Sequence, residues 1–205
     1  MRKPVERVFV VDDDPAVRKS LWRLLRSGGY EVSAFSSAEE FLAKLEPDAA
    51  GCAVLDLAMP GLDGLSLQQR LAAREVPMPV LFLTGRGDIP ASVKAMKAGA
   101  EDFLTKPVDE TVLFAALRRA LAHGREARET RRRVSDARGR LEMLTPRERE
   151  VLEGVVAGRL NKQIAGDLGI SEKTVKVHRA RVMEKLDASS VAELVRLTER
   201  AKTNS

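Results

Sequence analysis

Five short apolar segments, separated by helix-like stretches, most constrain how the first part of this 205-residue chain can fold. Between them, apolar residues recur at helical spacing, and the helical stretch that follows Asp14 stops at Gly28. A short apolar run between helices is typical of a buried parallel strand. We therefore predict an α/β fold of five β-α units, with a parallel sheet covered on both faces. The predicted strands are 8–11, 31–35, 52–55, 79–83 and 103–104, and later helices begin near Leu65, Pro90 and Asp109.

Polar side chains follow four of these strands at the point where each strand ends. They are Asp12, Asp13 and Asp14 after the first strand, Asp56 after the third, Thr84 at the end of the fourth, and Lys106 and Pro107 after the fifth. Sites in such sheets lie at the carboxyl ends of the strands, so we expect these groups to meet. Each residue alone also fits an ordinary turn, and for Asp14 we favour the role of a helix cap.

The residue types at these strand ends indicate phosphoryl chemistry. Clustered carboxylates repel each other unless a cation lies between them, and ligands that are all oxygen favour Mg²⁺. A carboxylate can attack phosphorus as a nucleophile, and Mg²⁺ with one lysine supplies the positive charge that phosphoryl transfer needs. The hydroxyl of Thr84 can bond a phosphoryl oxygen.

The charge and the pattern both change in the second part of the chain. Residues 1–124 carry 16 Lys and Arg against 17 Asp and Glu, whereas residues 125–205 carry 19 against 13, a net charge of +6. This excess suggests a polyanionic partner, nucleic acid before membrane. Residues 124–140 are charged and lack proline, and we predict a charged, helical linker there.

The last part of the chain reads as four helices. A capping box with proline at the first helical position opens the first helix at Thr145. The spacing of Ala165, Gly169 and Val175 is typical of a helix-turn-helix. The third predicted helix, Glu172–Lys185, carries a basic outward face that suits phosphate contacts and the major groove of DNA. A solvated charged face is the alternative.

Four motifs in the first part strongly resemble those of response-regulator receiver domains. They are VVDDD at 10–14, LDLAMPGLDG at 55–64, LTG at 83–85 and FLTKP at 103–107. The resemblance covers about residues 4–124 and implies a flavodoxin-like receiver domain, which we place at 1–123. It implies that Asp56 accepts a phosphoryl group. It also implies that Mg²⁺ is held by Asp12, Asp13, Asp56 and the main-chain carbonyl of Ala58.

The same resemblance implies roles for further positions. Thr84 and Lys106 would contact the phosphoryl group, and the bond between Lys106 and Pro107 would be cis. Phe103 matches the switch aromatic that reorients with Thr84 after phosphorylation; a buried core phenylalanine is the alternative. The switch would remodel a surface that we expect to include residues 91–97, Phe103 and residues 113–119.

The sequence over about residues 141–200 resembles the LuxR-type four-helix DNA-binding domain, which we place at 141–205. The resemblance rests on LTPREREVLEGVVAGRLNKQIAGDLGISEKTVKVHRARVMEKL and implies that Ser171–Leu186 contains the recognition helix. Ala180 stands where some relatives carry a basic residue that reads bases, and Arg179 or Arg181 can compensate. The expected DNA contacts are Lys173, Thr174, Lys176, Val177, Arg179, Arg181 and Lys185.

Together the two resemblances make the chain similar to response regulators of the NarL/FixJ type, and TGRGD at 84–88 favours the FixJ-like branch. This similarity implies phosphorylation by a sensor histidine kinase, a homodimer on phosphorylation, and regulation of transcription on double-stranded DNA, with RNA polymerase as a further partner. We expect no enzyme activity beyond the receiver's own phosphoryl transfer and dephosphorylation.

Two other function classes remain open at this point. An aspartyl-phosphate phosphatase with Asp12 as nucleophile would need an Asp-x-Asp arrangement and a cap domain, for which the chain leaves no room. A DNA-binding protein that works without phosphorylation would have a vestigial acidic pocket. The intact polar set at the strand ends argues against the second class.

The cysteine content and the apolar runs predict a cytoplasmic protein. Cys52 is the one cysteine, so the chain has no internal disulfide, and its apolar surroundings suit a small buried residue. The apolar run after the basic start is only four residues long, too short for a signal peptide or a membrane span.

Overall fold

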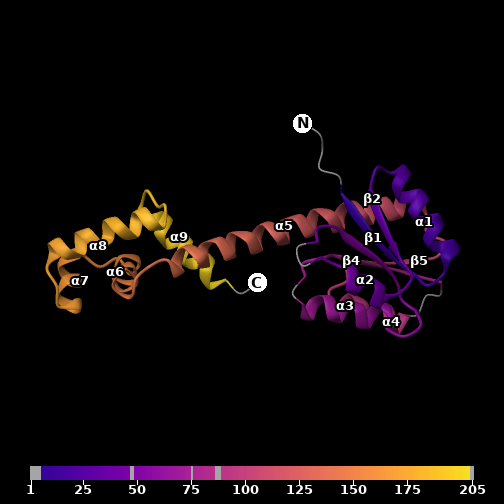
Figure 1. The fold of residues 1–205 in the computed structure, drawn as a ribbon, viewed down its shortest axis with the longest axis horizontal. Coiled ribbons are helices and arrows are strands. Elements are labelled where there is room, and N and C mark those ends of the chain that lie inside the picture. Colours follow the sequence, from indigo (N-terminus) through magenta and orange to yellow (C-terminus); the bar gives the residue numbers. More distant parts are fainter. Residues whose placement is uncertain (1–5, 47–48, 75, 86–88, 204–205) are drawn as a thin grey trace. The chain divides into compact units, whose positions relative to one another are not determined.

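The computed structural model describes residues 6–46, 49–74, 76–85 and 89–203, and within 89–92 it describes the backbone alone. The chain divides into two compact units between Arg128 and Glu129. Figure 1 labels their helices and strands. Residues 86–88 of the TGRGD motif lie outside the described residues.

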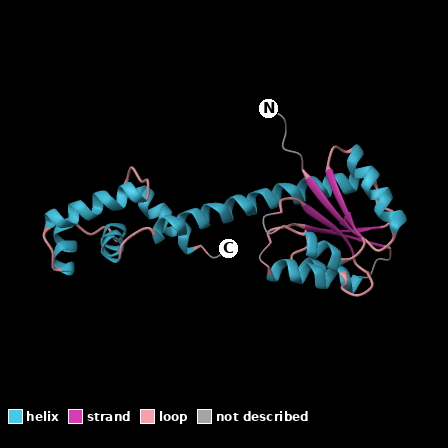
Figure 2. Cartoon of the chain, viewed as in Figure 1, coloured by secondary structure: helices cyan, strands magenta, loops and turns pink. Residues whose placement is uncertain are grey.

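The first unit is built on a five-stranded sheet in which each neighbouring pair is parallel. The strand order is β2-β1-β3-β4-β5, so β1 and β3 lie side by side although β2 separates them in sequence. Figure 2 shows these strands as magenta arrows. Their bounds are Arg7–Val11 for β1, Glu31–Phe35 for β2, Cys52–Asp56 for β3, Val80–Thr84 for β4 and Asp102–Thr105 for β5. The predicted α/β class and parallel sheet are confirmed.

Helices cover both faces of this sheet and close two separate cores. On one face α1 and α5 bury leucines and alanines such as Leu25 and Leu117 against β1, β3 and β4. On the other face α2, α3 and α4 pack around Phe41 and Phe82 (Figure 1). The bounds are Pro15–Ser27 for α1, Ala38–Lys44 for α2, Gly64–Ala73 for α3, Ile89–Lys97 for α4 and Glu110–Glu142 for α5.

Two aspartates close helix ends beside the carboxyl edge of the sheet. Asp14 accepts a hydrogen bond from the backbone N–H of Ala16 at 2.7 Å, which confirms its predicted role as the cap of α1. Asp63 caps α3 through the backbone N–H of Ser66 at 2.7 Å. These caps satisfy backbone donors that a helix N-terminus leaves without partners.

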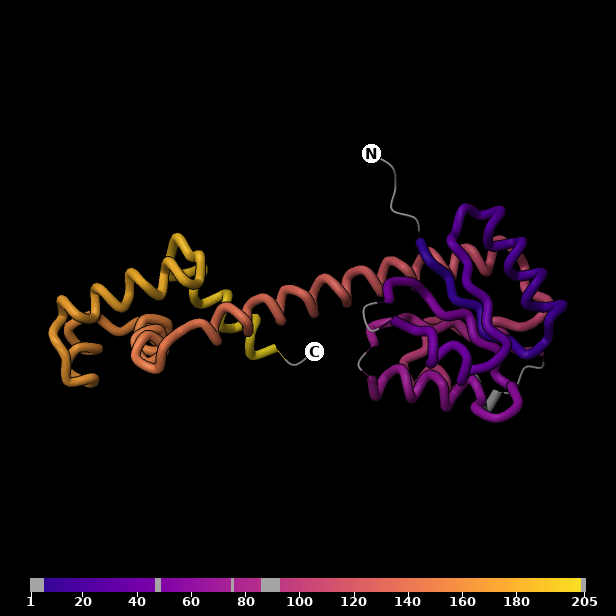
Figure 3. The backbone as a smooth tube through the Cα atoms, in the orientation of Figure 1, coloured from indigo at the N-terminus to yellow at the C-terminus, as the bar shows by residue number. Residues whose placement is uncertain are grey.

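The second unit has a core of its own, made by four helices that Figure 3 traces in orange to yellow. Thr145 and Glu148 form the predicted capping box. Gly169 has a φ of 64°, the left-handed conformation that suits the turn between the second and third of these helices. The helix bounds are Pro146–Val156 for α6, Asn161–Leu168 for α7, Glu172–Lys185 for α8 and Val191–Lys202 for α9.

The stretch predicted as a charged linker, residues 124–140, is helical throughout and belongs to α5. Its later residues are part of the second unit, where Val134 and Ala137 are buried and Arg138 donates to the main-chain oxygens of Ala201 and Thr203. The sequence did not reveal this packing, because only two small apolar residues interrupt the charges. Among the described residues, no helix is long and apolar enough to cross a membrane.

Gly64 brings the start of α3 against the end of β3. A Cβ atom at this position would lie 2.3 Å from the main-chain oxygen of Asp56, which is backbone and cannot rotate away. Gly64→Ala should therefore destabilise the first unit by about 1–3 kcal/mol, the usual cost of overpacking. Urea unfolding of the full chain, followed by the fluorescence of its one tryptophan, Trp22, measures this change.

The matched control for Gly64→Ala is Gln69→Ala on the exposed part of the same helix. It adds no atom beside Asp56, so its unfolding midpoint should stay near that of the wild type. Equal stability of Gly64→Ala and the wild type would contradict the close approach.

Candidate functional site

Three carboxylates gather at the carboxyl ends of β1 and β3. Asp12, Asp13 and Asp56 each offer an oxygen within 4.8 Å of the others. Adjacent pairing of β1 with β3 brings them together, since Val11 lies opposite Leu55 one residue before each acid. Asp12 and Asp56 are 1% and 8% exposed, whereas Asp13 is exposed to solvent. The cluster therefore opens to solvent beside Asp13, where a small cation can reach all three groups.

The Lys106 ammonium lies between the two buried carboxylates. Its Nζ is 2.5 Å from Oδ2 of Asp12 and 3.0 Å from Oδ1 of Asp56. The main chain holds this lysine in place, because its backbone N–H donates to the carbonyl of Thr84 at 2.6 Å. The bond between Lys106 and Pro107, expected to be cis, is cis in the structure.

Burial and charge shift the pKa values of this group in ways that fit a cation site. Burial raises the pKa of Asp56, Lys106 opposes the rise, Asp12 adds to it, and the pKa lies above its ordinary value. Burial alone would lower the pKa of Lys106, but its hydrogen bonds to Asp12 and Asp56 raise that pKa. At Asp56 the effect of burial thus outweighs that of the Lys106 ammonium, and a further cation would favour the ionised form of Asp56.

The other residues predicted for this site lie around the cluster. Thr84 is 5% exposed at the end of β4, opposite Thr105 in the register of β5. Phe103 is half-buried, and the centroid of its ring lies 6.3 Å from that of the Phe82 ring. It therefore packs at the edge of the core and is not the fully buried core phenylalanine of the alternative. Ala58 is an exposed loop residue that follows Asp56 by two positions.

The surface expected from residues 91–97, Phe103 and residues 113–119 needs a correction. Leu113, Ala116 and Leu117 are fully buried in the core under α5, because they face the sheet. The exposed apolar side chains are instead Val93 and Met96 of α4 and Val112 of α5, each nearly half exposed. The side chains of residues 91 and 92 lie outside the described residues.

In the second unit, α8 presents a basic outer surface. Ser171 caps the helix, and Val175 and Val182 bury its inner side. The exposed side chains include those of four predicted DNA contacts, Lys173, Lys176, Val177 and Arg181, and of Ala180. The spacing of buried and exposed residues therefore gives an outer surface of α8 that carries three exposed cations, with the exposed acids Glu172 and Glu184 near its two ends.

Three of the predicted DNA contacts have partners inside the unit. Nζ of Lys185 lies 2.7 Å from Oε2 of Glu148. Arg179 donates to the side-chain oxygen of Asn161 at 3.2 Å. The hydroxyl of Thr174 lies 2.9 Å from that of the cap residue Ser171. Lys185 and Arg179 thus link α8 to α6 and α7, and Thr174 bonds within the cap of α8, whereas the exposed cations of α8 face solvent.

The pairing with Lys185 explains why an acid can be buried in this unit. Glu148 is 2% exposed and also accepts the backbone N–H of Thr145 at 2.9 Å. The hydrogen bond from Lys185, assisted by that of Thr145, lowers the pKa of Glu148 to about 2. Sequence reasoning placed Glu148 in a capping box but missed its lysine partner, since the two are 37 residues apart.

Sequence reasoning also missed Arg18, which lies beside the carboxylate cluster. Its NH1 donates to the main-chain oxygen of Asp12 at 2.7 Å. A signal was present, because an arginine in the first turn of a helix is unfavourable beside the positive end of the helix dipole.

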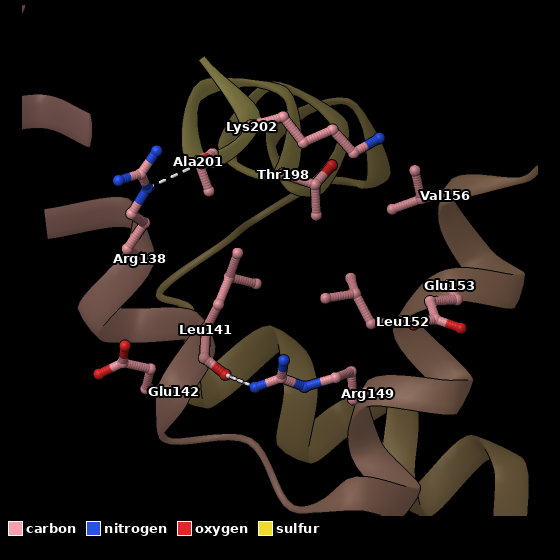
Figure 4. A pocket seen from close by; sticks show the side chains of 10 residues that line it. All are labelled: Arg138, Leu141, Glu142, Arg149, Leu152, Glu153, Val156, Thr198, Ala201 and Lys202. Carbon is pink, nitrogen blue, oxygen red and sulfur yellow. Dashed lines mark hydrogen bonds between the residues drawn. The ribbon is translucent and has the colours of Figure 1, made fainter. Parts of the chain in front are cut away.

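A groove in the second unit contains none of the predicted site residues. It has a volume of about 390 Å³ and lies between the end of α5, α6 and α9. Figure 4 shows Leu141, Leu152 and Val156 lining it, with Arg138 and Lys202 at its margin. The groove shows that the last turns of α5 form a wall of this unit.

Comparison with known proteins assigns a family to each unit. Residues 8–118 match the family of response regulator receiver domains. Residues 142–198 match the bacterial regulatory proteins of the luxR family. The two matches therefore correspond to the two predicted domains.

Full-length relatives share both parts in the same order. The chain is 47% identical over 192 residues to nodulation protein W of Bradyrhizobium diazoefficiens, covering 94% of this chain and 85% of the relative. It is 45% identical over 194 residues to the transcriptional regulatory protein FixJ of the same species, with 95% of each covered.

Solved structures agree with these relatives. The response regulator StyR is similar with a TM-score of 0.88 and 47% identity, covering 96% of this chain and 99% of StyR. Full-length FixJ from B. japonicum is similar with a TM-score of 0.59 and 44% identity, with 98% of each chain covered. The chain therefore belongs to the response regulators that join a receiver domain to a LuxR-type DNA-binding domain, and it is a transcription regulator.

Proposed function

We propose that a sensor histidine kinase phosphorylates Asp56 and thereby switches the protein to a dimer that binds DNA in the cytoplasm. The observation that carries this proposal is the meeting of three carboxylates and Lys106 at one edge of the sheet. In this function the Asp56 carboxylate takes up and loses a phosphoryl group, and we propose that the protein acts on no other substrate.

The donor set fits Mg²⁺, because every side-chain group in the cluster offers oxygen and the described residues bring no thiol or imidazole to it. Asp12, Asp13 and Asp56 would hold the ion, together with the carbonyl of Ala58. When bound, the ion supplies positive charge for the phosphoryl oxygens.

Three residues of the chain would take part in the phosphoryl transfer itself. An ionised oxygen of Asp56 attacks phosphorus, so that a P–O bond forms while the P–N bond to the kinase histidine breaks. Lys106 already contacts Asp56 and would stabilise the negative charge of the transferred group. Thr84, buried at the end of the neighbouring strand, would donate its hydroxyl to a phosphoryl oxygen.

Val93 and Met96 of α4 and Val112 of α5 are exposed apolar side chains, and the dimer contact would lie on these two helices. Thr84 and Phe103 would reorient on phosphorylation and change this face. Two DNA-binding domains brought together would read two half-sites, as two-fold symmetric dimers do. RNA polymerase would be the partner that senses the bound dimer.

Asp56→Asn should abolish phosphorylation, because an amide is not a nucleophile toward phosphorus. Incubation with acetyl phosphate and Mg²⁺ followed by intact mass measurement detects the acyl phosphate. Asp63→Asn is the matched control, since Asn still caps α3 and the acceptor is intact. A phosphorylated Asp56→Asn would contradict the assignment. A wild type that stays monomeric with beryllofluoride and Mg²⁺ would contradict the switch.

Lys106→Met should raise the pKa of Asp56 further above its ordinary value, because the lysine is the group that lowers it. At mildly acidic pH, less of the variant would then carry the ionised nucleophile. A ¹³C NMR pH titration of the side-chain carboxyls without Mg²⁺ measures this shift. Lys44→Met, which removes a surface partner of Glu40, should leave the Asp56 titration unchanged. An unchanged or lower pKa in Lys106→Met would refute the role of the lysine.

Lys176→Ala should weaken binding to a short DNA duplex and reduce the salt dependence by about one phosphate contact. The contrasting variant is Lys185→Met, which leaves Glu148 buried without its ammonium. We expect that variant to lower amide-exchange protection in α6 and α8, with little change in the salt slope. Equal affinity of Lys176→Ala and the wild type across a salt series would remove Lys176 from the interface.

A further inference from the structure

We infer that Arg18 is a positioning residue of the phosphorylation site. Its guanidinium holds the main chain at Asp12. The Asp12 carboxylate would therefore keep its position when Mg²⁺ replaces Lys106 as its partner. This inference rests on the proposed function, because it assumes that Asp12 helps to hold the ion.

The place of Arg18 in the helix is not explained by helix stability. Its backbone N–H donates to the carbonyl of Asp14 at 3.0 Å and closes the first turn of α1. A cation in this turn faces the positive end of the helix dipole, which is unfavourable. Side chains in a helix tilt toward its N-terminus, and this tilt carries the guanidinium back to the oxygen of Asp12.

Among the described residues, four hydrogen bonds hold Asp12, two at its main chain and two at its carboxylate. The main chain is held on both sides: its N–H donates to Phe35 at 3.3 Å, and its oxygen accepts from Arg18 at 2.7 Å. The carboxylate accepts from the backbone N–H of Asp14 at 2.9 Å and from Lys106 at 2.5 Å. Since Asp12 is 1% exposed, protein groups rather than solvent determine its orientation.

Cation binding would change these bonds unequally. A divalent ion on the Asp12 carboxylate would repel the Lys106 ammonium, which contacts Oδ2 of the same carboxylate, so the contact between Lys106 and Asp12 would weaken. The bond from Arg18 ends on the main chain and does not compete for a carboxylate oxygen. The bond from Arg18 would therefore persist and hold Asp12 in place while the Asp12 carboxylate exchanges Lys106 for the ion.

A positioning role and a purely electrostatic role predict opposite results. Removing a nearby positive charge should tighten the binding of a divalent cation if charge alone matters. Removing a group that holds a metal ligand in place should weaken that binding, as the loss of supporting hydrogen bonds does at metal sites. The direction of the change in Mg²⁺ affinity therefore separates the two.

The experiment is a Mg²⁺ titration of the full chain at constant ionic strength, followed by the backbone amide signals of Asp12, Asp13 and Asp14. We expect Arg18→Met to raise the dissociation constant about three- to tenfold, the range that one hydrogen bond can account for. Lys19→Met removes the neighbouring exposed cation and not the bond to Asp12. Its dissociation constant should equal that of the wild type or fall slightly.

Unchanged or tighter Mg²⁺ binding by folded Arg18→Met would overturn the inference while leaving the proposed function intact. If the methionine variant does not fold, Arg18→Gln takes its place, since its shorter side chain should also lose the bond, and the same two outcomes decide. Arg18→Lys keeps the charge and one donor, and an affinity between those of the wild type and Arg18→Met supports positioning. A wild type whose Asp13 signal does not respond to Mg²⁺ would overturn the proposed function together with the role of Arg18.

Discussion

Repulsion among the carboxylates at the end of β1 and β3 is the constraint on which the receiver unit depends. Asp12 and Asp56 are buried beside each other, and the Lys106 ammonium between them is what makes this burial tolerable. That lysine follows the edge strand β5, and the hydrogen bond from its backbone N–H to Thr84 fixes the position from which its side chain extends. The sheet, the cores on its two faces and the close approach at Gly64 together fix the positions of these charges.

The parts of the fold that depend on local pattern were predictable from the sequence. Short apolar runs alternating with amphipathic helices define parallel strands, and the carboxyl ends of parallel strands share one edge. The strand ends alone therefore predict that Asp12, Asp56, Thr84 and Lys106 share one edge of the sheet. The cap at Asp14 and the capping box at Thr145 were predictable for the same reason, since each depends on residues within one turn.

Partners distant in sequence were not predictable. A helical pattern tells which way a side chain points, but a long basic side chain can bend toward an acid 37 residues away, as Lys185 does toward Glu148. Arg179 turns to Asn161 in the same way. Arg179 and Lys185 are therefore half-buried, a placement that the helical pattern alone did not indicate. The burial of Val134 and Ala137 was hidden by the charges around them in α5.

The location of Lys106 also bears on the switch that we propose, in which one new charge on Asp56 would change the surface of the receiver. A phosphoryl group on Asp56 would add negative charge where the lysine now divides its contacts between two carboxylates. Lys106 is bonded to the main chain of Thr84, and Phe103, three residues before it, packs against Phe82 of the same strand as Thr84. A shift of Lys106 and Phe103 on phosphorylation would therefore act on β4 and β5, the strands that come before and after α4 in the chain. In the proposed switch, the bonds of Lys106 and the packing of Phe103 are therefore the contacts that phosphorylation of Asp56 would rearrange.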